Sequence, residues 1–101
     1  MHQQSARQLQ ERLTSLGLDA VLDHATQFFA RTSGVYSAFL ETRGPAHVVL
    51  RGQGGEEIAI AARLVPGGTA VSGSSYLFDQ QVARFLDSLP RPAATTNGAT
   101  A

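Results

Sequence analysis

Glycine and proline recur at even spacing between residues 34 and 68, and this pattern constrains the fold more than any other feature of the chain. Short strands joined by such tight turns must run antiparallel, because a parallel connection needs a crossover of a dozen or more residues. The pattern predicts a four-stranded antiparallel meander, with strands over 35–42, 46–51, 56–64 and 69–74. The breaks between them are at 43–45, 52–55 and 65–68, where Pro66 and Gly67 have the signature of a type II turn.

Helical spacing precedes and follows this meander. Ser5 and Gln8 have the spacing of a capping box, so we expect a first helix that ends at Gly17. Asp19 caps a second expected helix that ends near residue 32, although a strand over 27–31 is an alternative. A last helix is expected from Ser75 to Leu89. The apolar residues of the first two stripes are Ala6, Leu9, Leu13 and Leu16, followed by Leu18, Leu22, Ala25 and Phe29.

The expected fold is therefore α+β in two layers, in the order α-α-β-β-β-β-α, with the helices packed on one face of the sheet. Residues 1–89 are expected to form one compact domain. Residues 90–101 are rich in Pro, Ala, Thr and Gly, and we expect a disordered tail there.

The composition narrows the classes of function. The 101 residues include no cysteine, which excludes disulfides and thiolate chemistry. Eight arginines balance eight carboxylates, with no lysine, and the arginines are scattered, so we expect no nucleic-acid partner. The first dozen residues are polar and no apolar run is long enough for a membrane span, which favours a cytoplasmic protein without a membrane partner.

Turn-based registers assign residues to the two faces of the sheet. With Gln53-Gly54 and Pro66-Gly67 as turn centres, Arg51 faces Glu56 and Leu64 faces Thr69. At the first turn, pairing Thr42 with Ala46 sets Leu40 opposite Val48. One face then carries large side chains that suit helices, while the other is small and mildly apolar. Such a face needs a cover, and we expect a homodimer; a monomer whose first helix crosses to this face is the alternative. The expected interface residues are Ala38, Leu40, Val48, Leu50, Ala59 and Ala61.

An anion site is a second hypothesis. Gly73, Ser74 and Ser75 join the expected last strand to the last helix, where backbone N–H groups and hydroxyls can bind an anion. Arg51 or Arg84 is the expected helper. Ordinary helix capping by the same serines is the alternative.

Catalytic sets are not evident in the sequence. His2, His24 and His47 have no neighbour at the spacing of a metal motif, so we expect no metal and no cofactor. An acid–base enzyme would require His47, Glu41 and Arg51 to converge in one cleft. No motif identifies a family. The sequence thus predicts a small, non-catalytic, homodimeric interaction or adaptor module, open to a further protein partner, with a small-ligand or anion-binding protein as the alternative.

Overall fold

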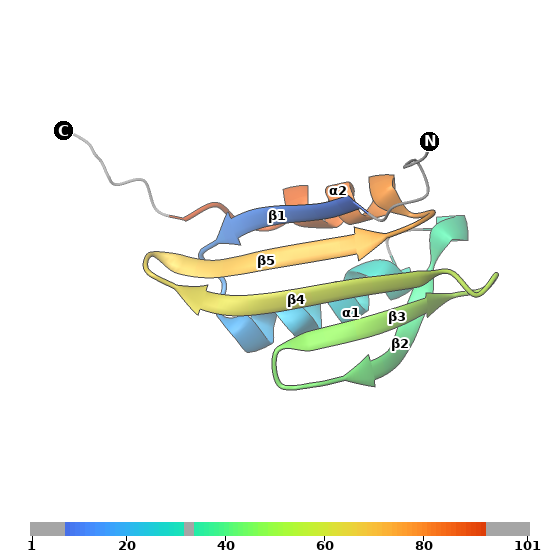
Figure 1. The fold of residues 1–101 in the computed structure, drawn as a ribbon, viewed down its shortest axis with the longest axis horizontal. Helices are drawn as coiled ribbons and strands as arrows, with labels where there is room; N and C mark the ends of the chain where they lie inside the picture. The colour runs from blue at the N-terminus through green and yellow to red at the C-terminus, as the bar shows by residue number, and fades with distance from the viewer. Residues whose placement is uncertain (1–7, 32–33, 93–101) are drawn as a thin grey trace.

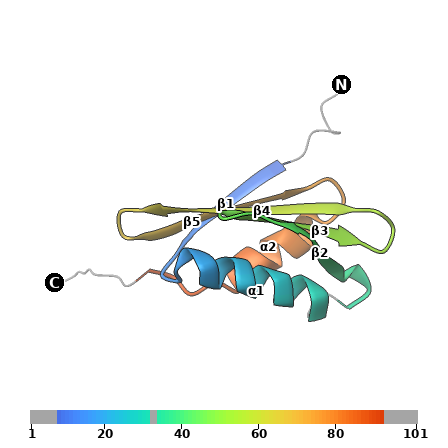
Figure 2. The same cartoon turned by 90° about the horizontal axis from the view of Figure 1, so that it is seen from below.

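A five-stranded antiparallel sheet, covered on one side by two helices, forms the part of the chain that the computed structural model describes, residues 8–31 and 34–92 (Figure 1). The strand order is β1-β5-β4-β3-β2, and all neighbours are antiparallel. Figure 2 shows both helices on the same side of the sheet, which confirms the two-layer α+β class. The elements are β1 (Gln8–Thr14), α1 (Leu18–Arg31), the 3-10 turn η1 (Gly34–Tyr36), β2 (Ala38–Arg43), β3 (His47–Gly52), β4 (Glu57–Val65), β5 (Gly68–Ser75) and α2 (Asp79–Asp87).

The first expected helix is wrong, because residues 8–14 form the edge strand β1. Leu9 and Leu13 are four residues apart, a spacing that suits one face of a helix and also one face of a strand. The pairing of β1 with β5 decides between the two, since it forms seven residue pairs from Gln8↔Ser75 to Thr14↔Thr69. Ser5 and Ala6, which the capping argument used, lie outside the described residues.

The other two helices are confirmed with shifted bounds. α1 begins at Leu18 and buries Val21, Leu22, Ala25 and Phe29, so the alternative strand over 27–31 does not form. α2 begins at Asp79 rather than Ser75, because residues 68–75 remain in β5. Within the described ranges, neither helix has the length and apolar character that crossing a membrane requires.

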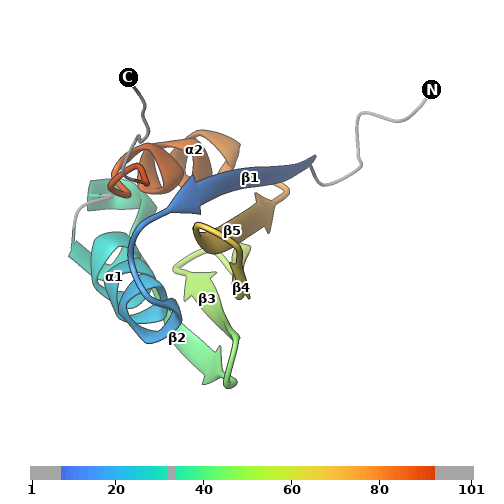
Figure 3. The same ribbon diagram turned by 90° about the vertical axis from the view of Figure 1, so that its left-hand side faces the viewer.

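The core fills the space between the helices and one face of the sheet. Figure 3 shows α1 beside β2 and α2 beside β1, so each helix covers one half of that face. Phe29 and Phe85 meet at the helix–helix contact with ring centroids 5.4 Å apart. The largest buried side chains from the strands are Val48, Leu50, Ile58, Ile60 and Val71.

The register of the hairpins departs from expectation at two of three turns. The β4–β5 register is confirmed, with Leu64 opposite Thr69. At the β3–β4 turn, Gly52 pairs with Glu56 around a three-residue loop, so Arg51 lies opposite Glu57 instead of Glu56. Gly55 has φ +91°, the left-handed conformation that ends such loops. One extra loop residue turns every side chain of β3 to the other face of the sheet.

The β2–β3 pairing differs as well. The expected first strand, 35–42, starts as a 3-10 turn, and β2 begins only at Ala38. A register irregularity between Leu40 and Thr42 then places Leu40 opposite Leu50. The expected pairing of Leu40 with Val48 is therefore wrong.

Hydrogen bonds close the two ends of the described chain onto each other. Thr14 is fully buried, and its hydroxyl donates to Pro90 O at 2.6 Å and accepts from Leu16 N at 3.3 Å. Thr69, opposite Thr14, donates to Leu16 O at 2.7 Å. Pro90 is thus bonded to the turn after β1, and residues 93–101 of the expected disordered tail lie outside the described residues.

We expect Thr14→Val to lower the free energy of unfolding by about 1–3 kcal/mol, because it takes the hydroxyl partner from the Leu16 N–H and leaves Pro90 O with the Ser15 N–H alone. The measurement is urea unfolding followed by circular dichroism. Thr42→Val is the matched control, since Thr42 is exposed on the edge strand β2. Equal effects of the two substitutions would contradict this account.

Candidate functional site

No described element covers the sheet face opposite the helices (Figure 2). Its side chains alternate along each strand with the buried ones, and cross-strand partners share the same face. We call this surface the open face. It comprises Leu9, Glu11 and Leu13 of β1, Ala70, Ser72 and Ser74 of β5, Glu57, Ala59, Ala61 and Arg63 of β4, His47, Val49 and Arg51 of β3, and Phe39, Glu41 and Thr42 of β2.

Only two of the six expected interface residues lie on the open face. Ala61 is exposed and Ala59 half-buried there. Leu40 is 43% exposed on the edge strand, but its register opposite Leu50 gives it the helix side. The remaining three are in the core with no exposed area, because the longer β3–β4 loop reverses β3 relative to β4, and β2 follows β3 through its pairing: Ala38, Val48 and Leu50.

Small side chains occupy the centre of the open face. Ser74 lies opposite Ala59, and Ser72 lies opposite Ala61, so four small residues form a square over β4 and β5. Leu9 continues the first of these rows onto β1, and Val49 continues it onto β3. The centre of the face is therefore flat and carries no charge.

An ion pair crosses one side of this centre. Arg63 of β4 donates to Glu11 of β1 at 3.0 Å, reaching over the intervening strand β5. Beneath it lies Ala70, which is only 8% exposed although it belongs to the open face. Both charged side chains are at least half exposed, so the pair itself contributes about 0–1 kcal/mol.

A second charged group lies on the other side of the centre. Arg51 donates to Glu41 at 2.7 Å and also lies 3.8 Å from Glu57. The hydrogen bond to Glu41 raises the pKa of the Arg51 guanidinium; desolvation opposes this rise, and the charges of Glu41 and Glu57 add to it. The expected pair of Arg51 with Glu56 is absent; Glu56 instead accepts from the Gly54 N–H at 3.0 Å.

The three residues of the acid–base hypothesis do not converge. Glu41 and Arg51 are joined, but His47 is exposed at the opposite end of β3, four residues from Arg51. Four strand residues span about 13 Å, too far for one proton-transfer site. The His47 ring instead packs against Gly44, where an added Cβ would lie within 2.6 Å of ring atoms.

The expected anion site at residues 73–75 lies inside the strand β5, and α2 begins only four residues later, at Asp79. Gly73 packs on the core: an added Cβ would lie 2.8 Å from Val82 Cγ1 and 2.9 Å from Ile60 Cδ1. Ser75 is 1% exposed, and its hydroxyl donates to Glu57 O and accepts from Phe78 N. Core side chains occupy the space next to Gly73, and the buried Ser75 hydroxyl already donates to Glu57 O. The core side of this segment therefore has no room for a ligand.

The expected helper arginines do not join that segment either. Arg51 is held by the two glutamates, and Arg84 is exposed on α2. Among the described residues, no group of three His, Cys, Asp or Glu side chains has the arrangement of a metal site.

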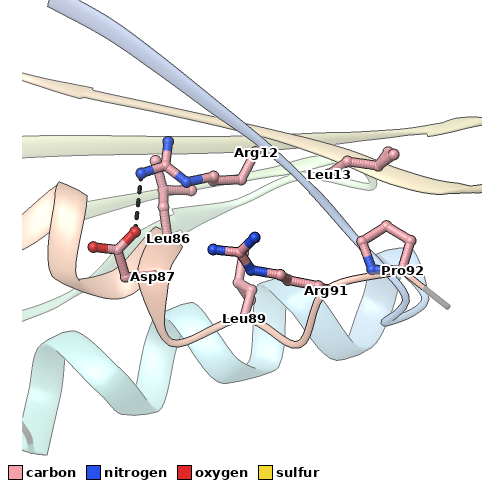
Figure 4. A pocket seen from close by; sticks show the side chains of 7 residues that line it. All are labelled: Arg12, Leu13, Leu86, Asp87, Leu89, Arg91 and Pro92. Carbon is pink, nitrogen blue, oxygen red and sulfur yellow. Dashed lines mark hydrogen bonds and ion pairs between the residues drawn. The ribbon is translucent and has the colours of Figure 1, made fainter. Parts of the chain in front are cut away.

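A groove beside the edge strand β1 is a feature that the sequence reasoning missed. It lies between β1 and the end of α2, with a volume of about 650 Å³ (Figure 4). Arg12 bridges it, donating to Asp87 at 2.9 Å. Placing residues 8–14 in a helix hid this groove, because only the strand brings Arg12 next to α2. Its lining residues are Arg12, Leu13, Leu86, Asp87, Leu89, Arg91 and Pro92.

Comparisons of the chain with protein-family models, with curated proteins and with solved structures gave no match. The function is therefore inferred from the surfaces that the described residues form.

If Gly73 serves packing, Gly73→Ala should lower the free energy of unfolding by about 1–3 kcal/mol through overpacking. The double variant with Ile60→Val should recover part of this loss, because Ile60→Val removes the Cδ1 atom that the new methyl group meets. Urea unfolding measures both. Ile58→Val, elsewhere on the buried face of β4, is the control and should show no comparable recovery when combined with Gly73→Ala. If the losses of unfolding free energy are additive in both double variants, the packing role of Gly73 is contradicted.

Proposed function

We propose that this protein is a non-catalytic, homodimeric interaction module, in which the open face docks on the open face of a second copy. A cytoplasmic location is part of the proposal, as is the capacity of the dimer to bind a further protein. The single observation that carries it is the uncovered sheet face with a small, uncharged centre between two charged groups. A solvated sheet face normally carries more charge than this at its centre.

The charges on β4 favour a second copy as the occupant. β4 is the middle strand of the sheet, and its open-face residues read Glu57, Ala59, Ala61, Arg63. A two-fold axis lying between the two faces, across β4 at residue 60, reverses this order in the partner. Glu57 then meets the partner's Arg63, and Ala59 meets the partner's Ala61.

The same axis suits the neighbouring strand. On β5 it brings Ser72 over the partner's Ser74, so small side chains meet small side chains at the centre. Two sheets pack face to face at about 10 Å when ordinary side chains interdigitate, and smaller residues permit a closer approach. The centre of the face, over β4 and β5, is thus complementary to itself in both charge and shape.

The sheet edges suit a homodimer less well. Pairing β1 with a second β1 over its full length would place Glu11 directly opposite the partner's Glu11, and like charges at that position are destabilising. The other edge strand, β2, carries the irregularity between Leu40 and Thr42, and such features discourage edge pairing. Face-to-face docking avoids both obstacles.

The size of the face sets the expected affinity. Five strands at about 4.8 Å spacing and about 25 Å in length give roughly 600 Å² on each copy. Roughly 1,200 Å² in total is at the lower limit for a specific interface, which is consistent with a dimer of micromolar affinity.

Ala61→Arg should convert the dimer to a monomer, because it puts a long charged side chain at the flat centre of the interface. Sedimentation velocity and native mass spectrometry at about 50 µM, well above the expected dissociation constant, measure the state. Ala20→Arg is the matched control, since Ala20 is exposed on α1 on the helix side. A wild-type monomer at this concentration, or equal loss of dimer in both variants, would refute the proposal.

Charge reversal tests the orientation of the two copies. Glu57→Arg and Arg63→Glu should each weaken the dimer several-fold, because each puts like charges together at the proposed contact. The double variant restores opposite charges there and should recover the dimer, as measured by the dissociation constant in sedimentation equilibrium. If the double variant is folded by circular dichroism but does not recover the dimer, this orientation is excluded.

A further inference from the structure

One cation of the groove between β1 and α2 has no hydrogen-bond or ion-pair partner among the described residues. Arg12 is occupied: it donates to Asp87 through Nη2 and to the Glu11 carbonyl through Nη1. Arg91 lines the same groove, and among residues 8–31 and 34–92 no hydrogen bond or ion pair joins its guanidinium to a partner. Five N–H donors in a fixed fork are therefore available at this place.

The charge of the groove favours an anion. Two arginines and one aspartate line it, which leaves a net charge of +1. Figure 4 shows the Arg91 guanidinium turned toward the Arg12–Asp87 pair, so the two positive groups lie at the same end of the groove. A carboxylate bound to Arg91 would stand close to Arg12 as well, and a planar carboxylate matches the guanidinium fork in a bidentate pair.

The remaining wall of the groove is apolar. Leu86 lies beside Arg12 and Leu89 lies by Arg91, with only 1% and 6% of their surface exposed, and Leu13 and Pro92 lie at the other end of the groove (Figure 4). A volume of about 650 Å³ is within the range of small-molecule sites and holds a ligand of ten to twenty heavy atoms. The groove thus places the positively charged Arg91 next to the apolar side chains of Leu86 and Leu89.

We propose that this groove binds a small organic carboxylate whose acid group pairs with Arg91 and whose apolar chain or ring lies on Leu86 and Leu89. The site goes beyond the proposed dimer, because it is formed by the edge strand and the end of α2 rather than by the centre of the open face. Its occupation therefore does not require the homodimer.

Decanoate is the probe, titrated into the full-length chain and followed by amide chemical shifts in NMR spectra. Binding with a dissociation constant of about 1 mM or tighter is expected for a flexible ligand of this size. The signals of Leu86, Leu89 and Arg91 should move, and those of Ala59 and Ala61 should not. Decylammonium, which has the same chain and the opposite charge, should bind at least tenfold more weakly.

Arg91→Gln should weaken decanoate binding about tenfold to a hundredfold, the factor carried by loss of a charge-assisted hydrogen bond. The affinity of Arg91→Lys for decanoate should lie between those of the wild type and Arg91→Gln, because lysine keeps the positive charge but lacks the two parallel N–H donors of the guanidinium. Arg84→Gln is the matched control: Arg84 is an exposed arginine of α2 that does not line the groove. No saturable binding below about 10 mM, equal affinity for decylammonium, or equal effects of Arg91→Gln and Arg84→Gln would overturn the proposal.

Discussion

The pairing of β1 with β5 is the constraint on which the rest of the structure depends. It brings the first and last strands together, and the buried hydroxyls of Thr14 and Thr69 fasten the junction after β1. Because β1 occupies one edge and β2 the other, α1 must carry the chain beneath the sheet between them. α2 follows β5 and packs beside α1, so both helices cover the same face (Figure 3). The opposite face is left uncovered as a direct consequence.

Loop length then decides which residues occupy each face. Strand side chains alternate, so one extra residue in a turn exchanges the buried and exposed sets of the whole strand. The three-residue loop before β4 buries Leu50 and turns Arg51 outward, where it meets Glu41. The resulting open face has few large side chains at its centre, because the large ones on β4, Ile58 and Ile60, point into the core.

Two surfaces with different chemistry result from this arrangement. The open face is flat, and β4 carries Glu57 toward one end and Arg63 toward the other. When a second copy docks in the reverse direction, each of these charges meets the opposite charge, so the face suits a second copy of the same surface. The groove is concave, apolar on one wall and positive at one end, which suits a small amphipathic acid. Both surfaces include residues of β1, since Glu11 faces one side of the sheet and Arg12 the other. The edge strand is therefore the element that joins the two proposed roles.

Local patterns in the sequence predicted the meander, the β4–β5 register, the apolar stripes of α1 and α2, and the α+β class. The turn at Pro66-Gly67 and the stripe of Leu22, Ala25 and Phe29 each depend on neighbouring residues, so they can be recognised without knowing the fold. The strand over residues 8–14 could not be predicted in this way, because a four-residue leucine spacing fits a helix or a strand, and the hydrogen bonds that select the strand come from residues 69–75. The same holds for the candidate sites. The open face depends on loop residues whose conformation reverses a strand, and the groove joins Arg12 to Arg91 across most of the chain, a contact that no local pattern encodes.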